Sequence, residues 1–142
     1  MVRRDLVARK VSRAATWLDD AAMLLSRPFE EYQQQPRDRD LAAFYLMLGI
    51  QECIDIAAHW VADEGWGSPD DAAGAFDVLA DRGVIEHPLA NVLHGAVGLR
   101  NRIAHGYARL DHERIHAEAT GGLTALRGFL SKVSEALDVG ER

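Results

Sequence analysis

The most constraining feature of this chain is a helical stripe of apolar residues that ends beside an arginine and a histidine. Between positions 88 and 106, apolar side chains recur at steps of three and four residues, the spacing at which positions of an α-helix share one face. Arg100 follows Ala96 by four residues and Val97 by three, so it lies on this apolar face. Burying an arginine there costs free energy unless a charge or a hydrogen-bonding group meets it, so we expect Arg100 to have such a partner. The stripe comprises Leu89, Val92, Leu93, Ala96, Val97, Ile103 and Ala104.

The same spacing predicts helices along most of the chain, and no segment alternates apolar and polar residues as a half-buried strand does. One helix is apolar almost all round between Leu41 and Ile50, which indicates burial on more than one side. The segment 27–37 contains two prolines and no periodic pattern, so it is expected to be a loop. The predicted fold is an all-α bundle of four long antiparallel helices plus a shorter additional helix, in one domain over residues 1–142. The expected helices span 3–26, 38–64, 69–83, 88–106 and 111 onward.

Capping signals set the expected ends of these helices. Ser68 is a preferred N-cap residue, and Pro69 suits the first position of the shorter helix. Gly83 is expected to end that helix as a C-terminal glycine cap, and Gly106 is expected to end the next helix for the same reason. Asp111 is the expected N-cap of the last helix.

Composition and charge narrow the classes of function. No apolar run approaches the roughly 18 residues of a membrane span, and the first residues lack the apolar segment of a signal peptide, so no membrane association is expected. Cys53 is the only cysteine, which favours a reducing, cytoplasmic location. The net charge of −6 argues against a general nucleic-acid coat protein. Residues 1–13 nevertheless carry five basic side chains against one acid, which predicts either a local basic patch or a solvated helix face.

Two further features of the sequence concern polar side chains. Gln51, Asp55 and His59 recur every four residues on a mostly apolar helix, where they either line a polar cleft or hydrogen-bond to neighbouring helices. The other histidines are spread over helices and loops without the close spacing of metal ligands, so no metal site and no cofactor are expected.

Arg100 and His105 carry the chemistry that metal-free RNA cleavage requires. This reaction needs a base for the 2′-hydroxyl proton, an acid for the departing 5′-oxygen and positive charge on the phosphate. His105 can transfer protons near neutral pH, and the planar fork of Arg100 can bind two phosphate oxygens. Because such pairs are common in helices and these two side chains are turned about 140° apart, spacing by itself favours a structural salt bridge for Arg100. One histidine cannot easily serve as both acid and base, so catalysis would favour a two-fold dimer with two histidines in one cleft.

The residues around this pair resemble the motif of a known family. Arg100, His105 and Tyr107 match the R-x4-H-x-Y motif of HepT-like toxins, a branch of the HEPN superfamily. Residues 98–107 are similar to the wider family pattern, with Leu99 in place of its usual phenylalanine.

The resemblance extends along nearly the whole chain. Residues 49–59 are similar to the second-helix signature of the family, and residues 111–115 are similar to the restart of its last helix. Only the segment 27–37 and the tail after Leu137 have no counterpart. The resemblance implies a HEPN-type bundle that forms a homodimer, with the two motifs facing each other across a cleft. It also implies a metal-independent endoribonuclease that needs no cofactor.

The resemblance further implies roles for individual residues. Arg100 and His105 would be the catalytic pair, while Asn101 and Arg102 would orient or contact the RNA substrate. Tyr107 would accept AMP from ATP through a cognate MntA-like nucleotidyltransferase antitoxin, and this AMPylation would block activity. The alternative is a non-catalytic, substrate-binding partner subunit of a minimal nucleotidyltransferase, which would not need the motif. Neither interpretation implies DNA as a partner.

Overall fold

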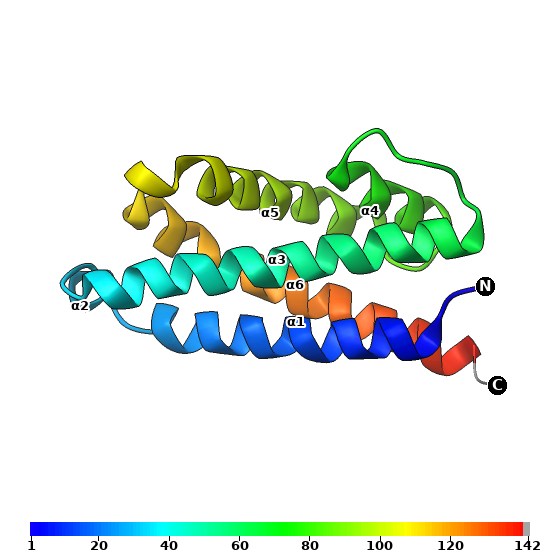
Figure 1. Ribbon diagram of the computed structural model, residues 1–142, viewed down its shortest axis with the longest axis horizontal. Coiled ribbons are helices and arrows are strands. Elements are labelled where there is room, and N and C mark those ends of the chain that lie inside the picture. The colour runs from blue at the N-terminus through cyan, green and yellow to red at the C-terminus, as the bar shows by residue number, and fades with distance from the viewer. Residues whose placement is uncertain (141–142) are drawn as a thin grey trace.

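Four long helices run along the long axis of the molecule, and each is antiparallel to the long helix that precedes it in the chain (Figure 1). The computed structural model describes residues 1–140, and within them the chain forms helices and no strands, as predicted. The long helices are α1 (Arg4–Leu25), α3 (Pro36–Glu64), α5 (His87–Gly106) and α6 (His112–Gly140). The shorter elements are α2 (Phe29–Gln33), α4 (Ala72–Asp81) and the 3-10 helix η1 (Tyr107–Arg109).

The two ends of the bundle bring different elements together. In Figure 1, α2, the end of α5 and the start of α6 lie at one end, whereas α4 and the start of α1 lie at the other. The antiparallel path of the long helices therefore carries the arginine- and histidine-containing end of α5 to the same end of the bundle as α2 and next to the beginning of α6.

The helix α3 is central to the bundle, because it contacts every other α-helix of residues 1–140. This position confirms the predicted burial on more than one side. By length and composition alone, α3 is apolar enough to cross a membrane, since its most apolar 18-residue window has a mean hydropathy of 1.5. The expectation that no segment approaches a membrane span is therefore wrong on composition. Half of that window is buried inside the bundle, so the core position of α3 accounts for its apolar character.

The helices α1 and α3 pack closely against each other. A Cβ atom at Gly49 would lie 2.5 Å from Cδ2 of Leu18, so a glycine on α3 makes room for a leucine of α1. Leu18 and Cys53 are both fully buried in the core. Burial raises the pKa of the Cys53 thiol well above its ordinary value, because the thiolate would lie in an apolar surrounding.

Two of the predicted helix caps are confirmed. Gly83 has a φ of 79°, and the N–H of Val84 donates to the carbonyl of Leu79 at 2.9 Å, which is the hydrogen bond of a C-terminal glycine motif. Asp111 caps α6, because its Oδ1 accepts a hydrogen bond from the backbone N–H of Arg114 at 3.1 Å.

Two other predicted caps are wrong. The N-cap of α4 is Asp71, whose Oδ1 accepts from the N–H of Gly74 at 2.8 Å, so Ser68 and Pro69 lie before the helix. Ser68 and Asp71 are both suitable N-cap residues and lie three positions apart, so the sequence alone does not decide which of them caps the helix. Gly106 has a φ of −118°, so it is not a left-handed cap, and the chain passes through it into η1.

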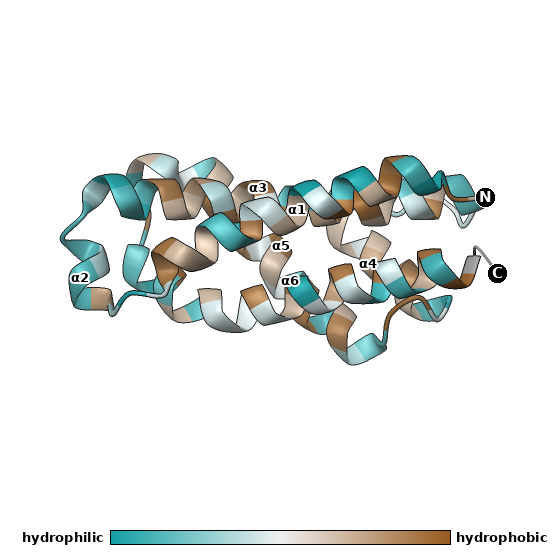
Figure 2. Ribbon diagram, turned by 90° about the horizontal axis from the view of Figure 1, so that it is seen from below, coloured by the Kyte–Doolittle hydropathy of each residue, from teal (hydrophilic) through white to brown (hydrophobic). Residues whose placement is uncertain are grey.

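The segment 27–37, predicted as a loop, contains α2, and α3 begins within it at Pro36. Figure 2 shows that α2 is largely hydrophilic, and its buried residue is Tyr32. The ring of Tyr32 packs against those of His112 and His116 on α6. Burial raises the pKa of Tyr32 to about 12. A helix of five residues that is fixed by such a distant contact leaves no periodic pattern in the sequence.

Candidate active site at the end of α5

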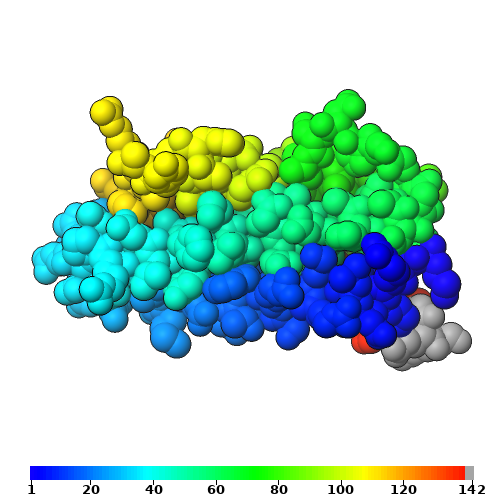
Figure 3. All heavy atoms as spheres, in the orientation of Figure 1, coloured from blue at the N-terminus to red at the C-terminus, as the bar shows by residue number. Residues whose placement is uncertain are grey.

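The residues of the predicted site lie in the last turns of α5 and at the beginning of η1. This segment, coloured yellow, projects at one end of the molecule in Figure 3. Arg100 and Arg102 are half-buried, whereas Asn101, His105 and Tyr107 are exposed. The site therefore has arginines anchored in the bundle and a histidine, an amide and a phenol open to solvent.

The buried face of α5 differs in part from the predicted stripe. Leu93, Ala96, Val97 and Ile103 are buried as expected, but Val92 is 53% exposed. Val92 lines a groove between α5 and α6 instead of the core. The helix is also buried at Ala90 and Leu99.

Arg100 has the kind of partner that its place on the apolar face required. Its Nη1 donates to Oε1 of Gln51 on α3 at 2.8 Å, and Nε2 of Gln51 donates to Oδ1 of Asp55 at 3.0 Å. The contact is with a neutral amide, and among residues 1–140 Arg100 forms no ion pair, so the predicted salt bridge is wrong. Its Nε is buried and has no hydrogen-bond partner there. The guanidinium is thus oriented from α3 while its charge is not neutralised by direct contact with a carboxylate.

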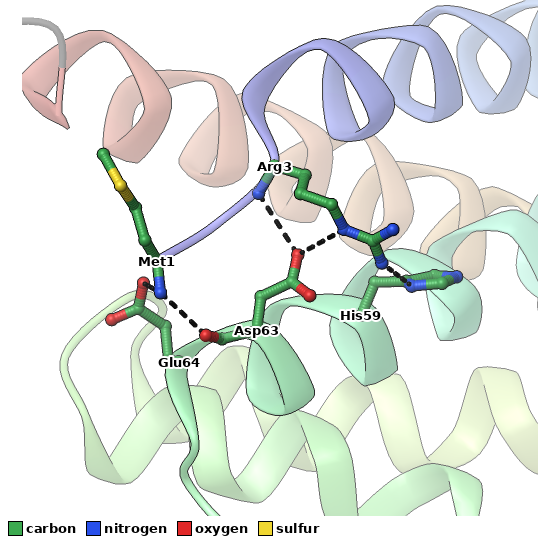
Figure 4. Close-up of polar contacts among 5 residues, drawn as sticks. All are labelled: Met1, Arg3, His59, Asp63 and Glu64. Carbon is green, nitrogen blue, oxygen red and sulfur yellow. Dashed lines mark hydrogen bonds and ion pairs between the residues drawn. The ribbon is translucent and has the colours of Figure 1, made fainter.

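The polar line on α3 divides into two separate networks. Gln51 and Asp55 belong to the Arg100 network, whereas Nδ1 of His59 lies 3.3 Å from Nη2 of Arg3. Figure 4 shows that Arg3 also donates from its backbone N–H and its Nε to Oδ2 of Asp63, at 3.1 and 3.2 Å. Hydrogen bonds from Arg3 hold the pKa of Asp63 below its ordinary value. His59 therefore serves the packing of α1 on α3.

Three basic side chains among residues 1–13 pair with acids of α3. Glu52 forms two ion pairs, from Oε1 to Nη1 of Arg13 at 3.2 Å and from Oε2 to Nζ of Lys10 at 3.7 Å. Arg3 is paired with Asp63 in the same way. The uneven charge of the first residues thus produces contacts between helices, which favours neither of the two simple predictions of a free basic patch or a solvated face.

Tyr107 is 80% exposed and stands beside a mostly apolar groove of about 360 Å³. Phe44 and Met47 of α3 line this groove, together with Ile103 and Leu110 from the other side. Phe44 is itself 48% exposed. An accessible phenol next to exposed apolar side chains is available both for modification and for contact with another molecule.

Two arginines that the sequence reasoning missed complete the basic surroundings of His105. Arg102, His105, Arg109 and Arg114 line a groove of about 390 Å³ between the end of α5 and the start of α6. Neither Arg109 nor Arg114 belongs to the motif. The signal that could have found them is the concentration of arginines immediately after Arg100 in an otherwise acidic chain.

The remaining histidines contact other parts of the bundle. Nε2 of His94 lies 2.8 Å from Oδ1 of Asp77, and Nε2 of His116 lies 2.8 Å from the carbonyl oxygen of Arg27. Within residues 1–140, no cluster of three or more His, Cys, Asp or Glu side chains has an arrangement able to hold a metal ion.

The geometry brings Arg100 to Gln51 but does not bring it to His105. No hydrogen bond joins these two side chains within the described part of the chain. What one chain supplies is an exposed imidazole for proton transfer and an oriented guanidinium for an anion, at the same helix end.

Comparison with known proteins identifies a family and relatives that this chain resembles. Residues 16–133 match the family model described as ribonuclease HepT-like. A putative RNase of Archaeoglobus fulgidus is 32% identical over 96 residues, which cover 67% of this chain and 72% of that protein. The mRNA nuclease HepT of Shewanella oneidensis is 32% identical over 81 residues, which cover 57% of this chain and 61% of that protein.

Solved structures show the same fold. The tri-AMPylated HEPN toxin of Shewanella oneidensis, solved in complex with MNT antitoxin, has a TM-score of 0.83 at 23% identity and covers 92% of this chain and 98% of its own. YutE of Bacillus subtilis, described as a cytosolic protein of unknown function, has a TM-score of 0.80 at 16% identity and covers 98% and 93%. The helical bundle is therefore the one seen in HEPN toxins.

Proposed function

Because the chain belongs to the HepT-like ribonuclease family, we propose that it is the toxin of a type VII-like toxin–antitoxin module and a metal-independent endoribonuclease. The observation that carries this proposal is the Arg100 guanidinium, which is oriented by Gln51 without being neutralised, at the same helix end as the exposed His105. Gln51 takes one of the five N–H donors of this guanidinium, so other donors remain for a phosphate. Residues 1–142 act as one HEPN domain in the cytoplasm.

In the proposed mechanism, each residue at the helix end has a defined task. His105 exchanges protons with the 2′-hydroxyl or the departing 5′-oxygen, and Arg100 binds the phosphate as negative charge develops on it. Asn101 and Arg102 contact and orient the RNA. A homodimer places two copies of this helix end in one cleft, so that one histidine serves as the base and its counterpart as the acid.

The partner that controls this activity is a cognate MntA-like nucleotidyltransferase antitoxin. The exposed hydroxyl of Tyr107 accepts AMP from ATP, which forms a phosphodiester and releases pyrophosphate. The added phosphate brings negative charge to the surroundings of Arg100 and Arg102, and the nucleotide fills space in the cleft. The similarity to a tri-AMPylated HEPN toxin supports this assignment.

The proposal is tested first by cleavage of a labelled RNA in excess EDTA. Wild-type protein is compared with His105→Ala, Arg100→Ala and a matched control, Arg127→Ala. Arg127 lies far along α6, and its guanidinium pairs with Asp19 of α1. We expect cleavage by wild type and the control and a loss of about 10²–10³-fold or more in the two motif variants. Equal cleavage by all four proteins would identify a contaminating nuclease and overturn the proposal. No cleavage by folded wild type that carries no AMP would favour the non-catalytic partner subunit instead.

The modification is tested with the purified antitoxin and ATP. We expect wild type to gain adenylate mass on Tyr107 and to lose ribonuclease activity, while Tyr107→Phe gains no mass and keeps its activity. Tyr32 serves as an internal control, because it is 1% exposed and should remain unmodified. Full activity after verified modification of Tyr107 would contradict the proposed control.

A further inference from the structure

The groove that contains His105 is richer in positive charge than the motif requires. Its charged and titratable lining comprises Arg102 and His105 of α5, Arg109 at the end of η1 and Arg114 in the first turn of α6, against one acid, Asp111, whose Oδ1 caps α6. The whole chain has a net charge of −6, so the body of the protein does not attract a polyanion. Any attraction for RNA near His105 must come from this local group of guanidinium side chains.

One carboxylate organises two of these arginines. Nη2 of Arg102 donates to Oε2 of Glu118, and Nε of Arg114 donates to Oε1 of the same side chain at 2.8 Å. All three side chains remain between 37% and 55% exposed, so the cluster faces solvent. A guanidinium has five N–H donors, and each arginine uses one of them in these contacts. Further donors are therefore left for an anion.

The groove continues beyond this cluster. A second section of about 400 Å³ shares Arg102 and Arg114 with the first, includes Glu118 and runs on between α5 and α6. Its lining includes Gly121 and Gly122, where a Cβ atom would meet nothing within 4 Å, so the section is open. The basic groove is thus the start of an open channel along the surface and not an isolated pit.

We propose that this groove binds the ribose–phosphate backbone of the RNA on one side of the bond that is cut. Arg109 and Arg114 contact phosphates beyond the scissile one, and Glu118 keeps Arg102 and Arg114 in position until a phosphate takes its place. The inference rests on the proposed ribonuclease function and adds to it residues outside the motif. A chain of phosphates matches arginines spread along a groove better than a single small anion does.

The first experiment measures binding without cleavage. The protein carries His105→Ala, and a fluorescent single-stranded 12-nucleotide RNA is titrated in EDTA at several salt concentrations. We expect Arg109→Ala and Arg114→Ala each to weaken binding several-fold and to reduce the salt slope by about 0.7 for each phosphate that is no longer bound. Arg127→Ala, which removes the same charge from α6, should change neither quantity. Unchanged binding in both groove variants would overturn the inference.

A second measurement separates this role from the chemistry and from the fold. In proteins with His105 intact, a long RNA should show a raised KM for Arg109→Ala and Arg114→Ala, whereas a dinucleoside monophosphate should be cut as by wild type. Loss of both substrates in a folded variant would make the residue part of the catalytic machinery and contradict the inference. If wild type cuts neither substrate, the proposed function itself fails, which is a different result.

Glu118 provides the sharpest test. In Glu118→Gln the competing negative charge is gone and the side chain keeps its size, so affinity for the 12-nucleotide RNA should rise a few-fold. A carboxylate that merely stabilises α6 predicts unchanged or weaker binding, and that result would overturn its assigned role. If the groove variants keep RNA binding but lose binding to the antitoxin, the groove is a protein interface and the assignment to RNA is wrong.

Discussion

The α1–α3 contact and the α5–α6 contact are built from similar residues, yet one is closed and the other is open. In the first, Lys10 and Arg13 share Glu52, whose side chain is 13% exposed. In the second, Arg102 and Arg114 share Glu118, whose side chain is 37% exposed. The glycines differ in the same way, because the space beside Gly49 of α3 is filled by Leu18, while Gly121 and Gly122 of α6 face empty space.

The difference shows that a basic cluster in the sequence does not by itself identify a binding surface. Where helices approach closely, acids of the partner helix neutralise the arginines and fix the packing. Where helices stay apart, the same residue types keep donors that face solvent. The exposed fraction of the shared carboxylate distinguishes the two cases. This fraction depends on the distance between the helices, which the sequence does not indicate.

The largest effect is expected at Gln51, which extends from α3 to the site. Gln51→Leu removes the acceptor of Arg100 and should lower kcat by about tenfold to hundredfold with little change in KM, because the guanidinium is no longer held in place. Gln51→Glu should not recover this loss, because its carboxylate would neutralise Arg100 and would face the carboxylate of Asp55, to which the amide of Gln51 donates. Gln34→Leu, at an exposed position, is the control. Full activity in Gln51→Leu would show that α3 does not position Arg100.

The next effect compares the two kinds of glycine. Gly49→Ala should destabilise the fold by about 1–3 kcal/mol, because its Cβ would lie 2.5 Å from Leu18. Gly121→Ala should stabilise it by about 0.5–1 kcal/mol, because alanine favours the helix and meets nothing nearby. Urea unfolding of both variants measures the difference. The opposite sign in both variants would mean that the open and closed contacts are assigned the wrong way round.

A smaller effect is expected from the two shared carboxylates. Glu52→Gln weakens charge-assisted contacts in the closed seam between α1 and α3 and should cost about 1 kcal/mol of unfolding free energy. Glu118→Gln lies in the open contact and should cost less than about 0.5 kcal/mol. Thermal and urea unfolding in low and high salt would check both values. A larger cost at Glu118 than at Glu52 would contradict the comparison.

The smallest effect concerns pH at the start of α6. Burial, with a contribution from Arg39, lowers the pKa of His112, although Asp40 and Asp111 oppose the shift. The unfolded chain therefore binds a proton more readily, so stability is fully present above the ordinary histidine pKa of about 6.5 and declines as pH falls through it. His112→Asn should make the decline between pH 7.5 and about 5 shallower. His87→Asn, at an exposed position, should leave it unchanged, and a steeper decline in His112→Asn would refute the sign.

The long helices were predictable because their apolar period repeats over many turns. Caps were predictable where one residue had no competitor, as at Gly83 and Asp111, and failed where Ser68 stood close to Asp71. The helix α2 was missed because Tyr32 is fixed by histidines about 80 residues further along the chain, and such contacts leave no local pattern.

The candidate site was predictable in its residue types more than in its contacts. The place of Arg100 on an apolar face required a partner, but nothing in the spacing identified Gln51, which lies 49 residues earlier. Arg109 and Arg114 were missed because the groove that unites them forms only when α5 and α6 meet beyond η1. The catalytic roles of Arg100 and His105 stay predictions until the cleavage assay is done.

The burial of Cys53 has a practical consequence for watching this molecule at work. Its thiol is fully enclosed and its pKa is raised by burial, so it should not react with maleimides at neutral pH in the folded protein. The natural chain is therefore a cysteine-silent background for labelling. A cysteine introduced at position 106, where a Cβ atom meets nothing within 4 Å, would carry a fluorophore beside the motif without any other mutation. In the proposed homodimer, energy transfer between a donor-labelled and an acceptor-labelled copy would report the approach of the two helix ends in real time.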